Sequence, residues 1–416
     1  MTVNRIDIIR PDAPKLADYG AYDVGVRTLM LVDENRVDVL STQPGLPNVI
    51  YDRSLTVEVW YPAKLGPDQS RGGEYRTITR NPEISTTLVG QGVRDAAPNT
   101  ALGKCPLVVI SHGYPGNRFL MSHLAENLAS KGFVTVSIDH RDSTYDDQQA
   151  VSSTLYNRPL DQRFVIQRMD ELSQHEDSFL GGLVDASNTG VVGYSMGGYG
   201  LINNLGGGFS DVALLSPMAP PNELLAQHAA RNPQYAEQLD PRIRAGFAIA
   251  PWGMESGVWL AQDLAGIRTP TFYVAGDNDT ISGYEQGVRA IYKNAVNSER
   301  YLLTYQNAGH NAGAPYPAPR EILDSPTGEG ADHYLDPVWD NVRMNNVMNH
   351  FATAFFGLYL HADSSMSPYL DLSRSGAKTS DSSAQDMPAA GNWTGFPEGS
   401  AVGLSLEKLR RRTGAA

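Results

Sequence analysis

The stretch TGVVGYSMGG, Thr189–Gly198, decides the fold of this chain. An apolar, strand-like run ends in the pattern Gly-x-Ser-x-Gly, and small residues that can open a helix follow it. A serine in this pattern sits on a sharp, strained turn, and glycine is needed at 193 and 197 because side chains there would collide. The turn directs the Ser195 hydroxyl into a cleft and leaves the backbone N–H of Met196 free to bind an oxyanion. A glycine-rich turn in some other α/β protein is the alternative, so the interpretation needs support from other segments.

Three further segments give that support. Pro106–Ser111 is an apolar run suited to a buried parallel strand, and it leads into the histidine-glycine loop His112–Gly116. A second buried strand, Thr271–Gly276, ends in the acidic turn 277–279, and the strand-like run 301–305 leads to a loop histidine, His310. The chain order serine, aspartate, histidine is that of the α/β-hydrolase triad. The sequence therefore predicts an α/β-hydrolase fold with a serine nucleophile.

The chemistry requires these residue types. A serine hydroxyl is a weak nucleophile at neutral pH, so His310 is expected to take the Ser195 proton and return it to the leaving group. A buried carboxylate orients the imidazole and stabilises its cation. In α/β-hydrolases the histidine-glycine loop supplies the second oxyanion N–H, which is that of Tyr114 here. We expect His112 to fix that loop and not to act as the base.

The resemblance extends to a narrower branch. The segment SHGYPGNR (Ser111–Arg118), the segment LAENLASKGF (Leu124–Phe133) and the His140-Arg141-Asp142 triplet follow in that order. This succession resembles the platelet-activating-factor acetylhydrolase and dienelactone-hydrolase-like branch, and the likeness covers roughly residues 106–310. It implies a serine esterase without a cofactor.

The triad acid is where the sequence departs from that branch. The acetylhydrolases place an aspartate just before a tryptophan after the sixth strand, but Pro251 precedes Trp252 here. We therefore expect the acid at the next strand end, with Asp279 as first choice. Asp277, expected to cap its own turn, is the second candidate, and Glu255 is the third.

Composition limits the class of protein. The net charge of −13 disfavours nucleic acid and anionic membranes as partners. The lone cysteine, Cys105, permits no intrachain disulfide, and no cluster has the spacing of a metal site. The first residues lack the pattern of a signal peptide, and no apolar run is long enough to span a membrane, so we expect a cytoplasmic enzyme.

The alternation of predicted strands and helices along the chain predicts one hydrolase domain, residues 1–362 with its core at roughly 20–362, and an extension at 363–416. The expected sheet is doubly wound and mostly parallel, with an antiparallel edge formed by the N-terminal hairpin. We expect helices near 119–131 and 160–178, a strand near 212–216 and a packing helix at 341–360. Two inserts, a helical one at 218–244 and a Pro- and Gly-rich one at 311–336, are either lids over the site or solvated surface excursions.

The extension reads as a linker at 364–391, followed by apolar anchors that dock on the body or on a second subunit, and then a solvated helix end near Leu406–Arg412. The anchors are Trp393, Phe396, Val402, Leu404 and Leu406. The aromatic residues near the elbow and the Trp252 segment are candidates for the substrate pocket or for the core: Tyr194, Tyr199, Trp252 and Trp259.

These features predict a serine hydrolase that cleaves a small or short-acyl carboxylic ester through an acyl-enzyme. The same triad serves amidases and C–C bond hydrolases, which are the alternatives among enzymes. A non-catalytic binding module on this fold is the alternative from another class, and the intact triad disfavours it.

Overall fold

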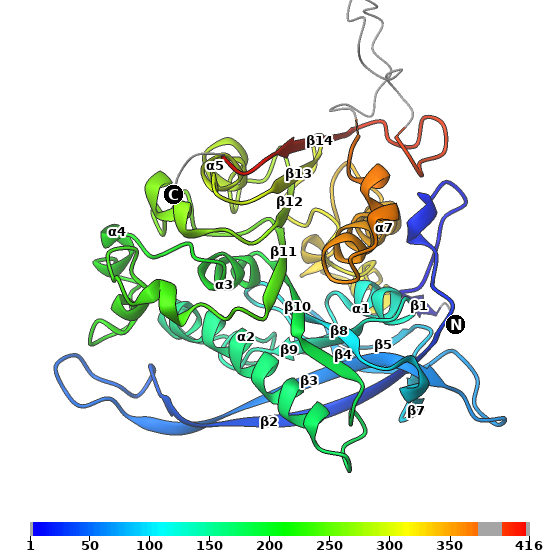
Figure 1. Cartoon of the computed structure of the whole chain (residues 1–416), viewed down its shortest axis with the longest axis horizontal. Coiled ribbons are helices and arrows are strands. Elements are labelled where there is room, and N and C mark those ends of the chain that lie inside the picture. The colour runs from blue at the N-terminus through cyan, green and yellow to red at the C-terminus, as the bar shows by residue number, and fades with distance from the viewer. Residues whose placement is uncertain (1–2, 373–392, 413–416) are drawn as a thin grey trace, which may run out of the picture.

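The computed structural model of the chain describes residues 3–372 and 393–412 (Figure 1). Within these ranges the larger sheet runs in the order β14-β13-β12-β11-β10-β8-β9-β3-β2-β6, with β7 beside β3. Its strands are β2 (Asp23–Val37), β3 (Ile50–Lys64), β6 (Val93–Arg94), β7 (Ala97–Pro98), β8 (Cys105–Ser111), β9 (Val134–Asp139), β10 (Val184–Tyr194), β11 (Ile243–Ile249), β12 (Thr271–Gly276), β13 (Arg300–Tyr305) and β14 (Leu404–Leu409). A smaller sheet runs in the order β1 (Asn4–Arg5), β5 (Ser85–Val89) and β4 (Glu74–Ile78).

Helices pack on both faces of the larger sheet. The α-helices are α1 (Ser122–Ala129), α2 (Val151–Gln174), α3 (Met196–Asn204), α4 (Asp211–Leu214), α5 (Arg289–Asn294), α6 (Arg320–Leu323) and α7 (Asn341–Tyr359). The shorter helical turns are η1 (Lys15–Ala17), η2 (Thr100–Leu102), η3 (Leu224–His228), η4 (Tyr235–Gln238), η5 (Ala261–Gly266), η6 (Tyr284–Val288), η7 (Ala331–His333) and η8 (Ser364–Tyr369). Across the described ranges, none of these helices has the length and apolar character needed to cross a bilayer.

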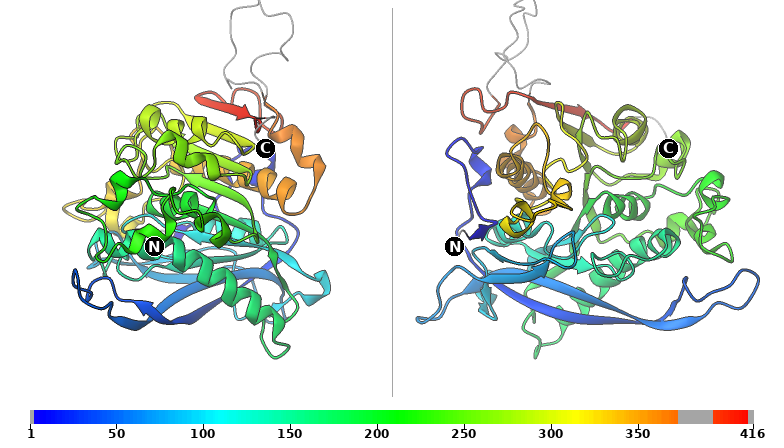
Figure 2. Two further views of the ribbon diagram at one scale, coloured as in Figure 1. Left: turned by 60° about the vertical axis from the view of Figure 1, so that its left-hand side comes forward. Right: turned by 180° about the vertical axis from the view of Figure 1, so that it is seen from behind.

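The centre of the sheet is parallel, as the sequence predicted. Strands β9, β8, β10, β11, β12 and β13 pair with one another in parallel, in that order. The antiparallel hairpin β2–β3 adds to β9 on the N-terminal side and extends past the rest of the sheet, in blue in Figure 2. The α/β-hydrolase fold is thereby confirmed. The carboxyl ends of the parallel strands lie at one edge, which is where such sheets bind ligands.

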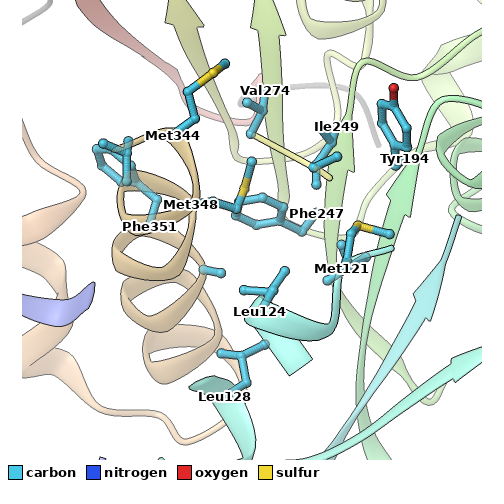
Figure 3. Close-up of a cluster of buried hydrophobic side chains, with 14 of the residues drawn as sticks. Met121, Leu124, Leu128, Tyr194, Phe247, Ile249, Val274, Met344, Met348 and Phe351 are labelled. Atoms are coloured by element: carbon cyan, nitrogen blue, oxygen red, sulfur yellow. The ribbon is translucent and has the colours of Figure 1, made fainter. Parts of the chain in front are cut away.

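Two hydrophobic cores hold the layers together. One fills the space between the sheet and helices α1 and α7, and the other lies under α2, α3 and α5. In Figure 3, Leu124 and Leu128 of α1 face α7 residues such as Met348, with Phe247 of β11 between them. Both faces of the central strands are buried, which explains why these strands are continuous apolar runs in the sequence.

The C-terminal extension completes the sheet edge. Strand β14 pairs antiparallel with β13, from Leu404 opposite Tyr305 to Leu409 opposite Arg300. Trp393, Phe396, Leu404 and Leu406 are buried in the body's core, whereas Val402 is exposed. The predicted helix end at 406–412 is therefore wrong, because most of this segment pairs with the edge of β13 as strand β14. Much of the predicted linker at 364–391 lies outside the described residues.

Two other local predictions are also wrong. The expected strand at 212–216 is helix α4, because the Ser210 hydroxyl accepts a hydrogen bond from the backbone N–H of Ala213 and caps a helical turn. The expected helix at 218–244 consists of two short 3₁₀ turns, η3 and η4.

Candidate active site

Ser195 occupies the turn between β10 and α3. Its φ of 52° and ψ of −112° lie in a region that side-chain-bearing residues rarely adopt. A Cβ atom on Gly193 would lie 2.4 Å from the carbonyl oxygen of Gly197, and one on Gly197 would lie 2.0 Å from that of Ser111. Glycine is thus required on both sides of the serine, for the steric reason that the sequence suggested. The turn presents a strained serine at the carboxyl end of a central strand.

His310 and Asp279 meet beyond the ends of strands β13 and β12. His310 lies in the loop after β13, and its Nδ1 is 2.9 Å from Oδ2 and 3.1 Å from Oδ1 of Asp279. Asp279 Oδ1 also accepts the backbone N–H groups of Ile281 (2.8 Å) and Ser282 (3.0 Å). Burial raises the pKa of Asp279, but the bonds from His310 and from the two N–H groups outweigh it, so the pKa lies below its usual range. Asp279 is therefore an ionised acceptor for His310.

The two other candidate acids lie elsewhere. Asp277 is exposed and its Oδ1 accepts the backbone N–H of Asn307 at 2.5 Å. That bond joins the ends of β12 and β13, so the expectation that Asp277 caps its own turn is wrong, and it does not involve His310. Glu255 is exposed and packs over Gly283, where a Cβ atom would lie 1.9 Å from its Oε1. Of the three carboxylates, only Asp279 contacts the histidine.

Ser195 and His310 line one cavity of about 380 Å³. Tyr114 lines it too, and a Cβ atom on Gly113 would lie 3.2 Å from the Ser195 Cβ, so the histidine-glycine loop runs beside the serine. In the part of the chain that the structure describes, the backbone N–H groups of Tyr114 and Met196 have no hydrogen-bond acceptor. A larger hollow of about 790 Å³ lies beside β4 and contains neither Ser195 nor His310. We assign the chemistry to the smaller cavity, because it holds the strained serine.

Three of the four predicted pocket aromatics do not reach this cavity. Tyr194 lines it, with its ring 5.3 Å from that of His310 and its hydroxyl donating to Asn311. Tyr199 and Trp259 are core residues instead: the Tyr199 hydroxyl donates to the Leu155 carbonyl, and Trp259 Nε1 donates to that of Gly207. Trp252 and Tyr199 border a separate small cavity. These three side chains lie in or against the core under α2, α3 and α5. Sequence spacing does not show whether a side chain faces this core or the cavity.

Polar residues from two distant segments complete the pocket wall. The insert at 311–336 contributes several of them, whereas the insert at 218–244 contributes none. The sequence identified both inserts as candidate lids but gave no signal for the segment after β4. The residues that were missed are Arg80, Asn81, Pro82, Ile281, Asn311, Glu329, Gly330, Asp332 and His333.

A second serine–histidine–aspartate chain lies beneath the histidine-glycine loop. The Ser111 hydroxyl is 2.8 Å from His140 Nε2, and His140 Nδ1 is 3.0 Å from Oδ2 of Asp161. All three side chains are fully buried, and burial lowers the pKa of His140 to about 3. This chain cannot meet a substrate, so it is a structural network.

His112 belongs to the same buried network. Its Nδ1 is 2.7 Å from the Gly113 carbonyl oxygen, and its Nε2 accepts the backbone N–H of His140 at 3.2 Å. Burial lowers the pKa of His112 well below its usual range, so the ring is neutral. His112 therefore holds the loop, as expected for a structural histidine. Among the described residues, no group of three or more His, Cys, Asp or Glu side chains is placed to hold a metal ion.

The chain is similar in sequence to several known proteins. Residues 71–226, less than half of the chain, match the family model "PET hydrolase-like". The chain is 24% identical over 250 residues to the bis(hydroxyethyl) terephthalate hydrolase of Streptomyces coelicolor, covering 60% of this chain and 64% of that protein. It is 24% identical over 206 residues to cutinase 2 of Thermobifida cellulosilytica, covering 49% of this chain and 60% of that protein. The chain thus spans less than two thirds of the length of these relatives.

A solved structure resembles nearly the whole fold. The ferulic acid esterase from Streptomyces cinnamoneus superposes with a TM-score of 0.55 at 20% identity, over 87% of this chain and 94% of that one. Together with the sheet order and the strained serine, these likenesses define the class of protein. The chain has the α/β-hydrolase fold, as the sequence predicted.

Proposed function

We propose that the chain is a serine esterase that cleaves a carboxylic ester through an acyl-enzyme. One observation carries the proposal: the strained Ser195 shares a cavity of about 380 Å³ with His310, whose Nδ1 is bonded to Asp279. The relatives named as a terephthalate ester hydrolase, a cutinase and a ferulic acid esterase support the ester as the bond cleaved.

Each group has a distinct role in the proposed reaction. Ser195 Oγ attacks the ester carbonyl carbon while its proton passes to His310 Nε2. The C–O bond to the leaving group then breaks, and His310 returns the proton to the departing alkoxide. Water, deprotonated by His310, attacks the acyl-enzyme and releases the acid. The N–H groups of Tyr114 and Met196 stabilise the oxyanion in both halves.

The cavity argues for a small substrate. A volume of about 380 Å³ is near the lower end of small-molecule sites. The wall around Ser195 is largely polar, with Arg80, Asn311 and His333 among its side chains. An ester with a short or compact acyl group fits this space better than a long aliphatic chain.

The nucleophile is tested by labelling and by turnover. Fluorophosphonate should add one phosphonyl group to the wild type, read by intact mass, and none to Ser195→Ala. The same variant should lose ester turnover about 10⁶-fold, as for the serine nucleophile of subtilisin. Ser187→Ala, at an exposed serine of the same strand β10, is the matched control and should label and turn over normally. A Ser195→Ala protein that keeps a tenth of the activity would refute the serine mechanism, and a wild type that neither labels nor turns over would favour a binding module.

A further inference from the structure

A buried arginine lies directly behind the histidine-glycine loop. Arg158 projects from α2 and is 1% exposed. Its Nη1 donates to the carbonyl oxygen of His112, and its Nη2 donates to that of Gly113 at 3.3 Å and to the Ser143 hydroxyl at 2.7 Å. The two carbonyls belong to the residues just before Tyr114, which carries one proposed oxyanion donor.

One of these carbonyls shares a peptide unit with that donor. The Gly113 C=O and the Tyr114 N–H are the two ends of one planar peptide and point in opposite directions. His112 also holds this carbonyl: its Nε2 accepts the N–H of His140, so its Nδ1 carries the proton and donates to Gly113. Two side chains therefore fix the Gly113 carbonyl from behind, and they fix the Tyr114 N–H with it.

The other oxyanion donor is held differently. The Met196 N–H shares its peptide with the Ser195 carbonyl, which accepts the backbone N–H groups of Tyr199 (2.9 Å) and Trp252 (3.1 Å). Both donors are backbone groups, so the Met196 peptide is held without help from any side chain. The Tyr114 peptide lies in a loop and has no such main-chain support among the described residues, so it depends on side chains.

Burying the Arg158 guanidinium costs free energy that a purely structural side chain would not need to cost. Among the described residues it forms no ion pair within 4.0 Å, because the nearby Asp161 is bonded to Arg53, Arg36 and His140. Burial lowers its pKa to about 9, so the guanidinium is still charged at neutral pH. A buried charge with only neutral acceptors costs free energy, and such costs are typical of functional sites.

We infer that Arg158 is a positioning residue of the oxyanion hole: its guanidinium fixes and polarises the Gly113–Tyr114 peptide so that the Tyr114 N–H meets the developing oxyanion. The inference rests on the proposed function, since the oxyanion forms only if Ser195 attacks a carbonyl. A positive group at the carbonyl end of a peptide strengthens the N–H at its other end as a donor. Arg158 itself does not touch the substrate.

Steady-state kinetics of Arg158→Gln and Arg158→Lys test the inference. Losing an oxyanion donor outright costs about 100- to 1000-fold in kcat, and a misplaced donor should cost about 10- to 100-fold in Arg158→Gln. KM should change less than about threefold, because the bond to the oxyanion forms in the transition state. Arg158→Lys keeps the charge but offers no planar fork, so it should recover part of the loss.

The matched control is another arginine of the same helix. Arg163 donates to the Gln238 carbonyl at 3.0 Å and to His228, away from the cavity. Arg163→Gln also removes a guanidinium–carbonyl bond from α2, at a more exposed position, and its kcat should stay within about twofold of the wild type. An equal loss in Arg163→Gln and Arg158→Gln would overturn the inference, because general loosening of α2 would explain both.

A transition-state analogue separates positioning from mere stability. A trifluoromethyl ketone adds to Ser195 and forms a charged hemiketal in the oxyanion hole, so its affinity should fall in step with kcat/KM across the Arg158 variants. Ser143→Ala removes the hydroxyl that accepts from Arg158 and donates to the His140 carbonyl oxygen at 3.1 Å. It should lower kcat severalfold with KM unchanged, and it decides the matter if Arg158→Gln does not fold.

The two proposals fail in different ways. A wild type without turnover or fluorophosphonate labelling refutes the esterase proposal, and the inference falls with it. A wild type that labels and turns over, with kcat unchanged in folded Arg158→Gln, or in folded Ser143→Ala where Arg158→Gln does not fold, refutes the inference alone.

Discussion

Replacing Asp279 with asparagine should abolish the proposed ester hydrolysis while leaving the fold almost intact. The carboxylate accepts three N–H groups: His310 Nδ1 on one side and the backbone of Ile281 and Ser282 on the other. Asparagine can keep both backbone bonds through its Oδ1. Its Nδ2 then faces His310 Nδ1, and two donors cannot meet, so the imidazole must move its proton to Nε2.

The size of the effect follows from that tautomer. A neutral ring protonated at Nε2 cannot accept the Ser195 proton, and the equivalent change in trypsin-like enzymes lowers kcat about 10⁴-fold, or about 5 kcal/mol of transition-state stabilisation. The free energy of unfolding should fall by only about 1 kcal/mol, since a charge-assisted hydrogen bond is replaced by a neutral one of opposite direction. Turnover of a nitrophenyl ester and urea unfolding measure the two quantities on the same protein.

Two other carboxylates serve as controls for Asp279. Asp277→Asn should keep its turnover, because that side chain accepts a backbone N–H and does not reach His310. Glu255→Gln should also keep its turnover, because Glu255 packs on Gly283. If Glu255→Gln alone abolishes turnover, or if Asp279→Asn retains a tenth of it, the assignment of the acid is wrong.

Three further predictions concern the pH dependence of stability, metal ions and the acyl length of the substrate. The lowered pKa of Asp279 stabilises the folded state above the ordinary pKa of 3.8, and this contribution is lost as pH falls through the lower folded value. In urea titrations the stability difference between wild type and Asp279→Asn should therefore shrink below about pH 3.8, and a difference that grows there would contradict the ionised pairing. Dialysis against EDTA should leave the esterase rate unchanged, and loss restored by zinc would reveal a metal site. Nitrophenyl esters should show kcat/KM falling from acetate to long acyl chains, and a steady rise would indicate an open groove.

The sequence predicted the parts of the site that depend on local chemistry. Gly193 and Gly197 are required by contacts with the nearby backbone, so the elbow can be recognised from five residues. The strand ends that carry Asp279 and His310 follow fully buried apolar runs, which a parallel sheet requires on both faces. The choice of Asp279 over Asp277 rested on the spacing of the acid after this strand in other α/β-hydrolases and on the expectation that Asp277 caps its turn. These features are encoded within a few residues of each other.

The support for the loop could not be predicted in the same way. Helix α2 begins at Val151, well before the helix expected near 160–178, because Pro159 and a run of polar residues conceal its first turns. Asn157, Arg158, Asp161 and Gln162 are all buried on it. Hydrophobic periodicity identifies a helix by its apolar face, so a helix that buries a polar face escapes detection. The partners of these side chains, such as the Gly197 carbonyl that Gln162 binds at 2.9 Å, come from distant segments.

The two serine–histidine–aspartate sets show what distinguishes a reactive site from a structural one. In the buried set, the Ser111 hydroxyl is hydrogen-bonded to His140, the aspartate is held by two arginines, and every side chain is shielded from substrate. In the other set, the Ser195 hydroxyl has no hydrogen-bond partner among the described residues, its backbone is strained and it opens into a cavity. Hydrogen-bond geometry alone would favour the first set, since catalytic bonds are often loose without substrate. Access and backbone strain favour the second, and the first set then has a different use, because it anchors the His140 backbone that orients His112 behind the oxyanion loop.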